Sequence, residues 1–421
     1  MSKLSRFATC CAVVLTSCVS AGAFAQENPS LSFLALGDAG LHLDWYDQDD
    51  FDKTKDEFIA SERADWLEDL KPADEFAHPP IYVYPETGYA VEQPGQFATA
   101  KAMQNYCAQE HKRCEFMIVL GDNIYPDGAD GSGSESDQKM LWDILEAPYA
   151  ELGLEEPMFK MYAALGNHDW KSSRAGRDAQ IDFGAREDTR YTMAHPGFYT
   201  YRRGPAQFWA LDTEMLLANT VVYKDRLDER GHEIVNSEPD PAPEWAKPQT
   251  PEEYAQLQWL AESMASSDAE WKFVYGHHTL WSAGGSKFGE AHALRPLLLP
   301  ILCRHADAWF NGHEHDLGVF SDSCESVLGH SDSPLPIIVS GAGAKQRAIN
   351  TRFHEYQEAT YPAYEGYWMQ GMTWGFAHVE LFDQQGRVSM ITTPNDQSGV
   401  PEHAFDFMFE NREDMPFSPP F

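Results

Sequence analysis

Five short polar motifs, each following an apolar run, constrain the fold of this chain more than any other feature. Each contains a glycine and carries Asp, Asn, His or Tyr side chains that bind metal ions. A single Asp or His beside a glycine is an ordinary turn residue, whereas five such motifs predict strands that deliver polar side chains to one sheet edge. The motifs are Gly37-Asp38-Ala39-Gly40, Gly121-Asp122-Asn123-Ile124-Tyr125, Gly166-Asn167-His168-Asp169, Val274-Tyr275-Gly276-His277 and Gly312-His313-Glu314-His315.

The apolar runs predict an α/β fold, because helical patterns lie between several of them. The hairpin-like end from Phe376 to Thr392 adds antiparallel strands. We expect strands at 31–36, 116–120, 158–165, 207–211, 271–275, 308–310, 336–339, 376–382 and 388–392.

The sequence predicts where one helix begins. Thr250 is a candidate N-cap, Pro251 suits the first turn and Glu253 completes a capping box. The following apolar stripe is expected to pack in the core and consists of Tyr254, Leu257, Leu260 and Met264.

The ligand types in the motifs indicate a binuclear metal centre. Such a centre needs carboxylate and imidazole ligands from separate strands, and one shared ligand that holds two cations about 3.5 to 4 Å apart. An Asp can be shared because both of its oxygens carry negative charge. His313 and His315 stand two residues apart on an expected loop, so they can face the same cleft and serve different metals.

These motifs resemble those of the calcineurin-like metallophosphoesterases, and specifically of the purple acid phosphatases of the small, tartrate-resistant type. The distinguishing residue is Tyr125, three residues after Asp122, because a phenolate at this place binds ferric iron in that subfamily. The resemblance covers most of residues 31–395 and implies a sandwich of two mixed sheets flanked by helices, in four layers. It extends to Leu211-Asp212-Thr213, Trp281-Ser282, Leu294-Arg295-Pro296-Leu297, Val339-Ser340-Gly341-Ala342-Gly343 and Trp374-Gly375-Phe376-Ala377.

The resemblance also implies a role for each motif residue. Asp38, Tyr125 and His315 would bind Fe(III), and Asp122 would bridge to a second divalent metal (Fe, Zn or Mn). That second metal would be held by Asn167, His277 and His313, with Asn167 also near the substrate. His168 would contact the phosphoryl oxygen or the leaving group as the catalytic residue. His278 is a further candidate substrate contact, and Glu314 is expected to be structural.

The chain departs from the family at one place. Relatives often carry a substrate-side histidine shortly after the Trp-Ser pair, where this chain has Ala283-Gly284-Gly285-Ser286-Lys287. Lys287 or His292 could supply a cation to the phosphate, although neither aligns convincingly.

The implied activity is hydrolysis of small phosphate monoesters by attack of a metal-bound hydroxide at mildly acidic pH. A phosphodiesterase or pyrophosphatase on the same scaffold is the alternative, since the metal ligands do not specify how many substituents the phosphate carries. A protein that binds metal or phosphate without turnover is less favoured, because every ligand position and His168 are present. The oligomeric state is left open.

The charge balance argues against a protein that binds nucleic acids or membrane surfaces. With 66 Asp and Glu against 31 Lys and Arg, the formal charge is −35, which repels nucleic acids and anionic lipid surfaces. Beyond residue 25 no apolar run is long enough to predict a membrane span.

The N-terminus resembles a signal peptide at residues 1–25. Lys3 and Arg6 precede an apolar stretch, and Ala23-Phe24-Ala25 provides a cleavage site, so we expect a secreted or periplasmic protein. A lipid anchor at Cys18 is the alternative. Proximity favours Cys107–Cys114 and Cys303–Cys324 disulfides in an exported chain, although other pairings and free thiols stay open.

The rest, residues 26–421, is interpreted as one catalytic domain with an acidic insertion at about 41–98. This segment has 15 Asp and Glu against four Lys and Arg, and leaves the sheet just after Asp38. Its aromatic residues favour a packed lid over the cleft, and its acids are expected to disfavour polyanionic substrates. Residues 237–251 contain five prolines and are expected to be a linker or loop.

Overall fold

The computed structural model describes residues 28–46, 52–69, 71–153, 159–218, 248, 250–413 and 415. The predicted signal peptide, Cys18 and most of the proline-rich segment lie outside these residues and stay predictions. Among the described residues, no helix has the length and apolar character needed to cross a bilayer.

Two mixed seven-stranded sheets form the centre of the protein, as the resemblance predicts. In order across the first sheet lie β16 (Glu402–Glu410), β15 (Gln385–Thr393), β14 (Trp374–Leu381), β1 (Leu31–Leu36), β4 (Met117–Leu120), β5 (Met161–Ala164) and β6 (Tyr191–Thr192). Across the second lie β13 (Tyr364–Gln370), β11 (Leu317–Asp322), β12 (Leu335–Ser340), β10 (Ala308–Asn311), β9 (Trp271–Tyr275), β8 (Ala206–Ala210) and β7 (Tyr199–Arg203).

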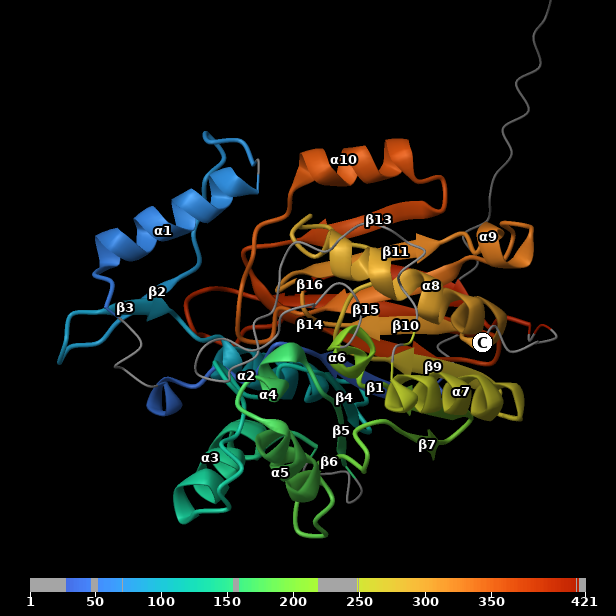
Figure 1. The fold of residues 1–421 in the computed structure, drawn as a ribbon, viewed down its shortest axis with the longest axis horizontal. Helices are drawn as coiled ribbons and strands as arrows, with labels where there is room; N and C mark the ends of the chain where they lie inside the picture. Colours follow the sequence, from blue (N-terminus) through green and yellow to red (C-terminus); the bar gives the residue numbers. More distant parts are fainter. Residues whose placement is uncertain are drawn as a thin grey trace, which may run out of the picture.

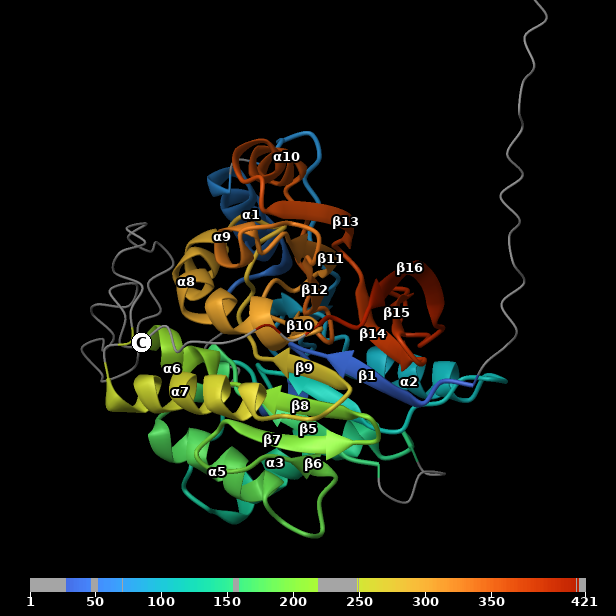
Figure 2. The ribbon, with the colours of Figure 1, turned by 90° about the vertical axis from the view of Figure 1, so that its right-hand side faces the viewer.

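Helices cover the outer faces of both sheets, which gives the four predicted layers (Figures 1 and 2). The first sheet packs against α2 (Gln96–Cys107), α3 (Glu135–Leu145) and α5 (Arg174–Gly184). The second packs against α6 (Thr213–Ala218), α7 (Pro251–Ala265) and α8 (Phe288–His305). The structure also has the helices α4 (Asn167–Trp170), α9 (Glu325–Leu328) and α10 (Thr351–Thr360), with 3-10 turns at Leu43–Trp45 and Ala147–Tyr149.

Aromatic rings fill the space between the sheets. Phe33 on β1 meets Phe208 and Phe273 of the opposite sheet, with ring centroids 5.2 Å and 5.8 Å apart. Fully buried rings contribute the largest apolar area per residue, so this layer is a major source of stability. It also fixes the two sheets against each other, which holds the loops at their ends in register.

Helix α7 confirms the predicted N-cap at Thr250, while the capping box with Glu253 stays a prediction and the apolar stripe is confirmed only in part. The Thr250 hydroxyl accepts a hydrogen bond from the Glu253 backbone N–H. Leu257, Leu260 and Met264 are buried, whereas Tyr254 is 49% exposed, so its placement in the core was wrong. Gln256 faces the core instead. Its side-chain oxygen accepts a hydrogen bond from the Asp212 backbone N–H, and its side-chain nitrogen donates one to the Asp212 carbonyl oxygen.

Both predicted disulfides are present, Cys107–Cys114 and Cys303–Cys324. The second joins the end of α8 to the start of α9. Replacing Cys303 and Cys324 together by serine is expected to lower the free energy of unfolding by about 3 kcal/mol, since the bridge closes a loop of 21 residues.

Urea denaturation of the oxidised proteins measures this effect. Replacing Cys107 and Cys114 is the comparison, and should cost less because that loop spans only seven residues. An unchanged denaturation midpoint in the Cys303/Cys324 variant would contradict the expectation.

The acidic segment forms α1 (Lys55–Glu68) and a small hairpin of β2 (Ile81–Val83) and β3 (Ala90–Glu92), and ends in the first turn of α2. Figure 1 shows α1 and the hairpin to one side of the two sheets. Helix α1 begins with a complete capping box, formed by Thr54 and Glu57. The segment therefore has its own ordered structure, as its aromatic content suggested.

Candidate metal centre

The ends of five strands converge at one edge of the molecule. Strands β1, β4 and β5 run parallel in the first sheet, and β9 and β10 run parallel in the second, so their carboxyl ends point the same way within each sheet. Backbone hydrogen bonds join the loops: Asp38 N–H donates to Gly121 O at 3.0 Å, and Gly312 N–H donates to His277 O at 3.0 Å. All the predicted ligands lie on these loops: Asp38, Asp122, Tyr125, Asn167, His277, His313 and His315.

A first group of ligand atoms surrounds the Tyr125 hydroxyl. Asp38, Asp122 and His315 each offer one atom, all within 4.8 Å of one another. Tyr125 Oη lies 2.9 Å from an Asp38 oxygen, 2.8 Å from an Asp122 oxygen and 3.1 Å from His315 Nε2. These four side chains could hold one cation.

A second group adjoins the first. Asp122, His277 and His313 offer atoms within 4.8 Å of one another. His277 Nε2 lies 3.3 Å from Asp122 Oδ1, 3.1 Å from Asn167 Oδ1 and 2.9 Å from His313 Nδ1. Asp122 thus belongs to both groups, in the position of a bridging ligand.

The electrostatics of the two groups suit cations. Burial raises the pKa of Asp38 to about 7, and burial followed by the Asp122 and Asp38 carboxylates raises that of Tyr125 well above its usual range. Ionised oxygens in such a pocket need compensating positive charge. Two carboxylates, a phenol, an amide and three imidazoles form a donor set typical of iron, zinc or manganese.

The backbone at the site is strained in the way that functional loops often are. Four of the predicted ligands have left-handed backbone conformations, with φ of 56° at Asp38, 51° at Asp122, 73° at His313 and 53° at His315. The loops are also packed too closely for a side chain at Gly166, where a Cβ would lie 2.2 Å from Asp122 Oδ1. The surrounding loops therefore hold the ligands in place before any ion binds.

Comparison with known proteins identifies the family. The family profile for calcineurin-like phosphoesterases matches residues 31–317, more than half of the chain. The chain belongs to the calcineurin-like phosphoesterase family.

Purple acid phosphatases are among its relatives. The chain is 28% identical to purple acid phosphatase 17 of Arabidopsis thaliana over 55% of its length, a match that spans only 59% of that relative. It is 25% identical to tartrate-resistant acid phosphatase type 5 of Sus scrofa, over 70% of this chain and 78% of that one. The fold is similar to that of the GAP50 anchor of the inner membrane complex of Plasmodium, with a TM-score of 0.54, 16% identity and coverage of 91% and 90% of the two chains.

Two acidic residues to which the sequence analysis assigned no role support the candidate metal centre. Glu290 Oε2 on α8 lies 2.5 Å from His313 Nε2, which leaves His313 Nδ1 facing the second group. A carboxylate on the far nitrogen fixes the orientation of a ligating imidazole. Asp169 accepts backbone N–H bonds from Asn123, Ile124 and Gly166, so it ties the β4 and β5 loops together.

His168 lies next to Asp122, the predicted bridging ligand. Its backbone N–H donates to Asp122 Oδ1 at 2.9 Å, while its ring lies 4.4 Å from the Tyr125 ring and its side chain is 18% exposed. Its Nδ1 contacts the carbonyl oxygen of Pro126, and the ammonium of Lys171 lies 3.0 Å from the same nitrogen. Lys171 was not predicted as part of the site.

The remaining candidates lie in different surroundings. His278 is fully buried and its Nδ1 contacts the Thr213 hydroxyl at 2.8 Å, so its substrate contact stays a prediction. Glu314 is also fully buried. Lys287 lines a cavity beside His315, whereas His292 accepts a hydrogen bond from the Arg295 guanidinium at 3.0 Å.

Proposed function

We propose that the protein is an exported, binuclear-metal acid phosphatase that hydrolyses phosphate monoesters. The observation that carries this proposal is the position of Asp122, which is shared by two adjoining groups of buried ligand atoms. In this proposal Asp38, Tyr125 and His315 hold Fe(III), and Asp122 bridges. Asn167, His277 and His313 hold a second divalent ion of iron, zinc or manganese.

The chain's own residues would position the substrate and move a proton. When bound, the two cations would polarise the phosphate and activate water for attack. His168 is next to the bridging Asp122 and partly exposed, so its ring can reach an oxygen of a bound phosphoryl group. Lys171 adds a positive charge beside it, which favours an anion at this place.

Covalent catalysis by a thiol has no support among the described residues. Their four cysteines all form disulfides. The disulfides also support export, because such bonds persist in oxidising compartments.

Assays with a chromogenic phosphomonoester, the matching diester and pyrophosphate, on protein secreted by its own signal, test the proposal. We expect turnover of the monoester at acidic pH, two metal ions per chain and an absorption band in the middle of the visible range. Preferential turnover of the diester or of pyrophosphate would replace the monoesterase assignment. Two bound metals without turnover of any of these substrates would indicate a binding protein.

Tyr125→Phe is expected to remove the visible band while the protein stays folded. The band requires charge transfer from a phenolate to ferric iron, and phenylalanine keeps the ring but lacks the oxygen that lies 2.8 Å from Asp122. The visible spectrum and near-ultraviolet circular dichroism measure the two effects. Tyr46→Phe controls for loss of a nearby phenol, since Tyr46 packs against the cluster of Leu41, Tyr125 and Ala344 and belongs to neither ligand group. A band that survives in Tyr125→Phe would show that the ferric tyrosinate assignment is wrong.

A further inference from the structure

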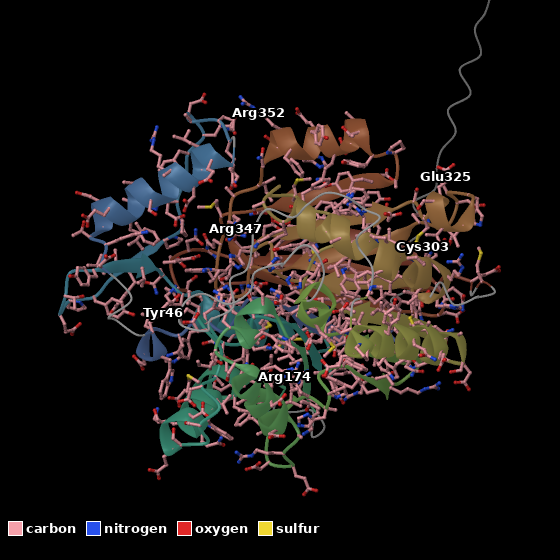
Figure 3. The ribbon with its side chains drawn as sticks, viewed as in Figure 1. Tyr46, Arg174, Cys303, Glu325, Arg347 and Arg352 are labelled. Atoms are coloured by element: carbon pink, nitrogen blue, oxygen red, sulfur yellow. A yellow bond between two sulfur atoms is a disulfide. The ribbon has the colours of Figure 1, made fainter. Side chains whose placement is uncertain are left out.

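A cavity of about 330 Å³ adjoins the candidate metal centre at His315. Several segments contribute to its lining, among them α1 with Asp69 and Lys71 after it, Glu92 at the end of β3, Ser286 and Lys287 before α8, and residues 345–348 after β12. Figure 3 labels Arg347, which lies between α1 and the body of the protein. The acidic segment therefore forms one wall of a space that opens beside a predicted ligand.

Cations gather in this cavity although the chain is strongly acidic. Its described lining contains Lys71, Lys287, Lys345 and Arg347 against four acids, Glu62, Asp65, Asp69 and Glu92. The whole chain has 31 Lys and Arg against 66 Asp and Glu. The ratio of cationic to acidic residues is therefore about twice as high in the cavity lining as in the whole chain. One of these cations, Lys71, comes from the acidic segment itself, whose effect on polyanionic substrates stays a prediction.

Arg347 is the cation best placed to bind a ligand. Its backbone N–H donates to the carbonyl oxygen of His315 at 2.9 Å, so its position is tied to the metal centre. Its Nη1 is buried and has no hydrogen-bond partner among the described residues. Guanidinium groups bind carboxylates and phosphates through paired N–H donors, so an anionic group would satisfy this atom.

The other charges of the cavity favour the same kind of ligand. Lys345 lies 3.8 Å from Glu92 and only 5.0 Å from the Tyr125 ring, which places its ammonium between the cavity and the centre. Burial raises the pKa of Glu92 to about 7, so this acid carries less negative charge at acidic pH. Lys71, by contrast, is paired with Asp69 at 2.7 Å.

We propose that this cavity binds a second anionic group on the alcohol part of the substrate, so that the preferred substrates are phosphomonoesters whose alcohol carries a carboxylate or another phosphate. The inference rests on the proposed phosphatase activity. While the phosphate to be cleaved is at the metal centre, the rest of the molecule would extend past His315 to Arg347.

The test compares phenyl phosphate with 4-carboxyphenyl phosphate, and with the corresponding bisphosphate, on the metal-loaded enzyme. We expect a higher kcat/KM for the doubly anionic esters. Arg347→Gln should lower the ratio of kcat/KM for 4-carboxyphenyl phosphate over phenyl phosphate by about tenfold, mainly through KM, with a smaller effect at high salt. Lys71→Gln should lower the same ratio by a smaller factor, because Asp69 already offsets part of its charge.

Arg352→Gln is the matched control. Arg352 lies five residues further along on α10, is exposed and does not line the cavity, so its loss should leave the ratio unchanged (Figure 3). Titration calorimetry with benzenephosphonate and 4-carboxybenzenephosphonate measures the same preference without turnover. Equal kcat/KM values for the esters, or an unchanged ratio in Arg347→Gln, would overturn the inference while phenyl phosphate hydrolysis upheld the proposed function. Absence of turnover with every ester would overturn both.

Discussion

Asp122→Ala is expected to lose metal from both sites together and to lower phosphatase turnover by more than about 10²-fold. The reason is geometric, because Asp122 belongs both to the group with Asp38 and His315 and to the group with His277 and His313. Its Oδ1 lies 3.3 Å from His277 Nε2 and its Oδ2 lies 2.8 Å from the Tyr125 hydroxyl. Replacing an outer partner of a metal ligand already costs about 10- to 100-fold, so a bridging ligand should cost more.

Metal content per chain, measured after dialysis, checks this expectation alongside turnover. Asp127→Ala is the control, since Asp127 lies on the same loop but is exposed and belongs to neither group. The Asp122 variant also leaves the His168 N–H without its acceptor, so circular dichroism must first show that the protein is folded. Retention of two metals in the folded variant would refute the bridging assignment.

The buried strands were predictable because their sequences are continuous apolar runs. Strands β1 and β9 have the predicted bounds, and each of their residues is buried. The edge strands β13 and β16 were not expected, because most of their residues are exposed or half-buried and polar residues interrupt their apolar ones. Strand β11 is fully buried but is interrupted by Gly318 and ends in Ser321-Asp322, so its sequence lacks the apolar run that marks its neighbours.

The ligand cluster was predictable for a different reason. Each ligand lies two to five residues after the end of a strand, and parallel strands bring such positions to one edge of the sheet. Glu290 and Arg347 have no comparable signal, since Glu290 is the third residue of a helix and Arg347 follows a buried loop. Their places beside His313 and His315 depend on how α8 and the loop after β12 pack, which spacing along the chain does not encode.

His168→Ala is expected to lower turnover by about 10²-fold or more while the protein keeps both metals. The structure separates the two effects, because His168 contacts Asp122 through its backbone N–H at 2.9 Å, a bond that alanine retains. Its ring nitrogen Nε2 is 3.9 Å from Asp122 Oδ2, so the side chain is a neighbour of the bridging ligand and lies outside both ligand groups. What alanine removes is a group able to hydrogen-bond or protonate the substrate.

The size of the loss should depend on the leaving group. A strongly acidic phenol leaves the phosphate as a phenolate and needs no proton. If the His168 ring acts as an acid, turnover of such an aryl ester should therefore fall less in His168→Ala than turnover of an alkyl ester. His195→Ala is the control, because His195 is largely exposed, pairs with Asp182 and belongs to neither ligand group. Metal analysis accompanies the kinetics, and loss of metal equal to that of Asp122→Ala would show that His168 is itself a ligand.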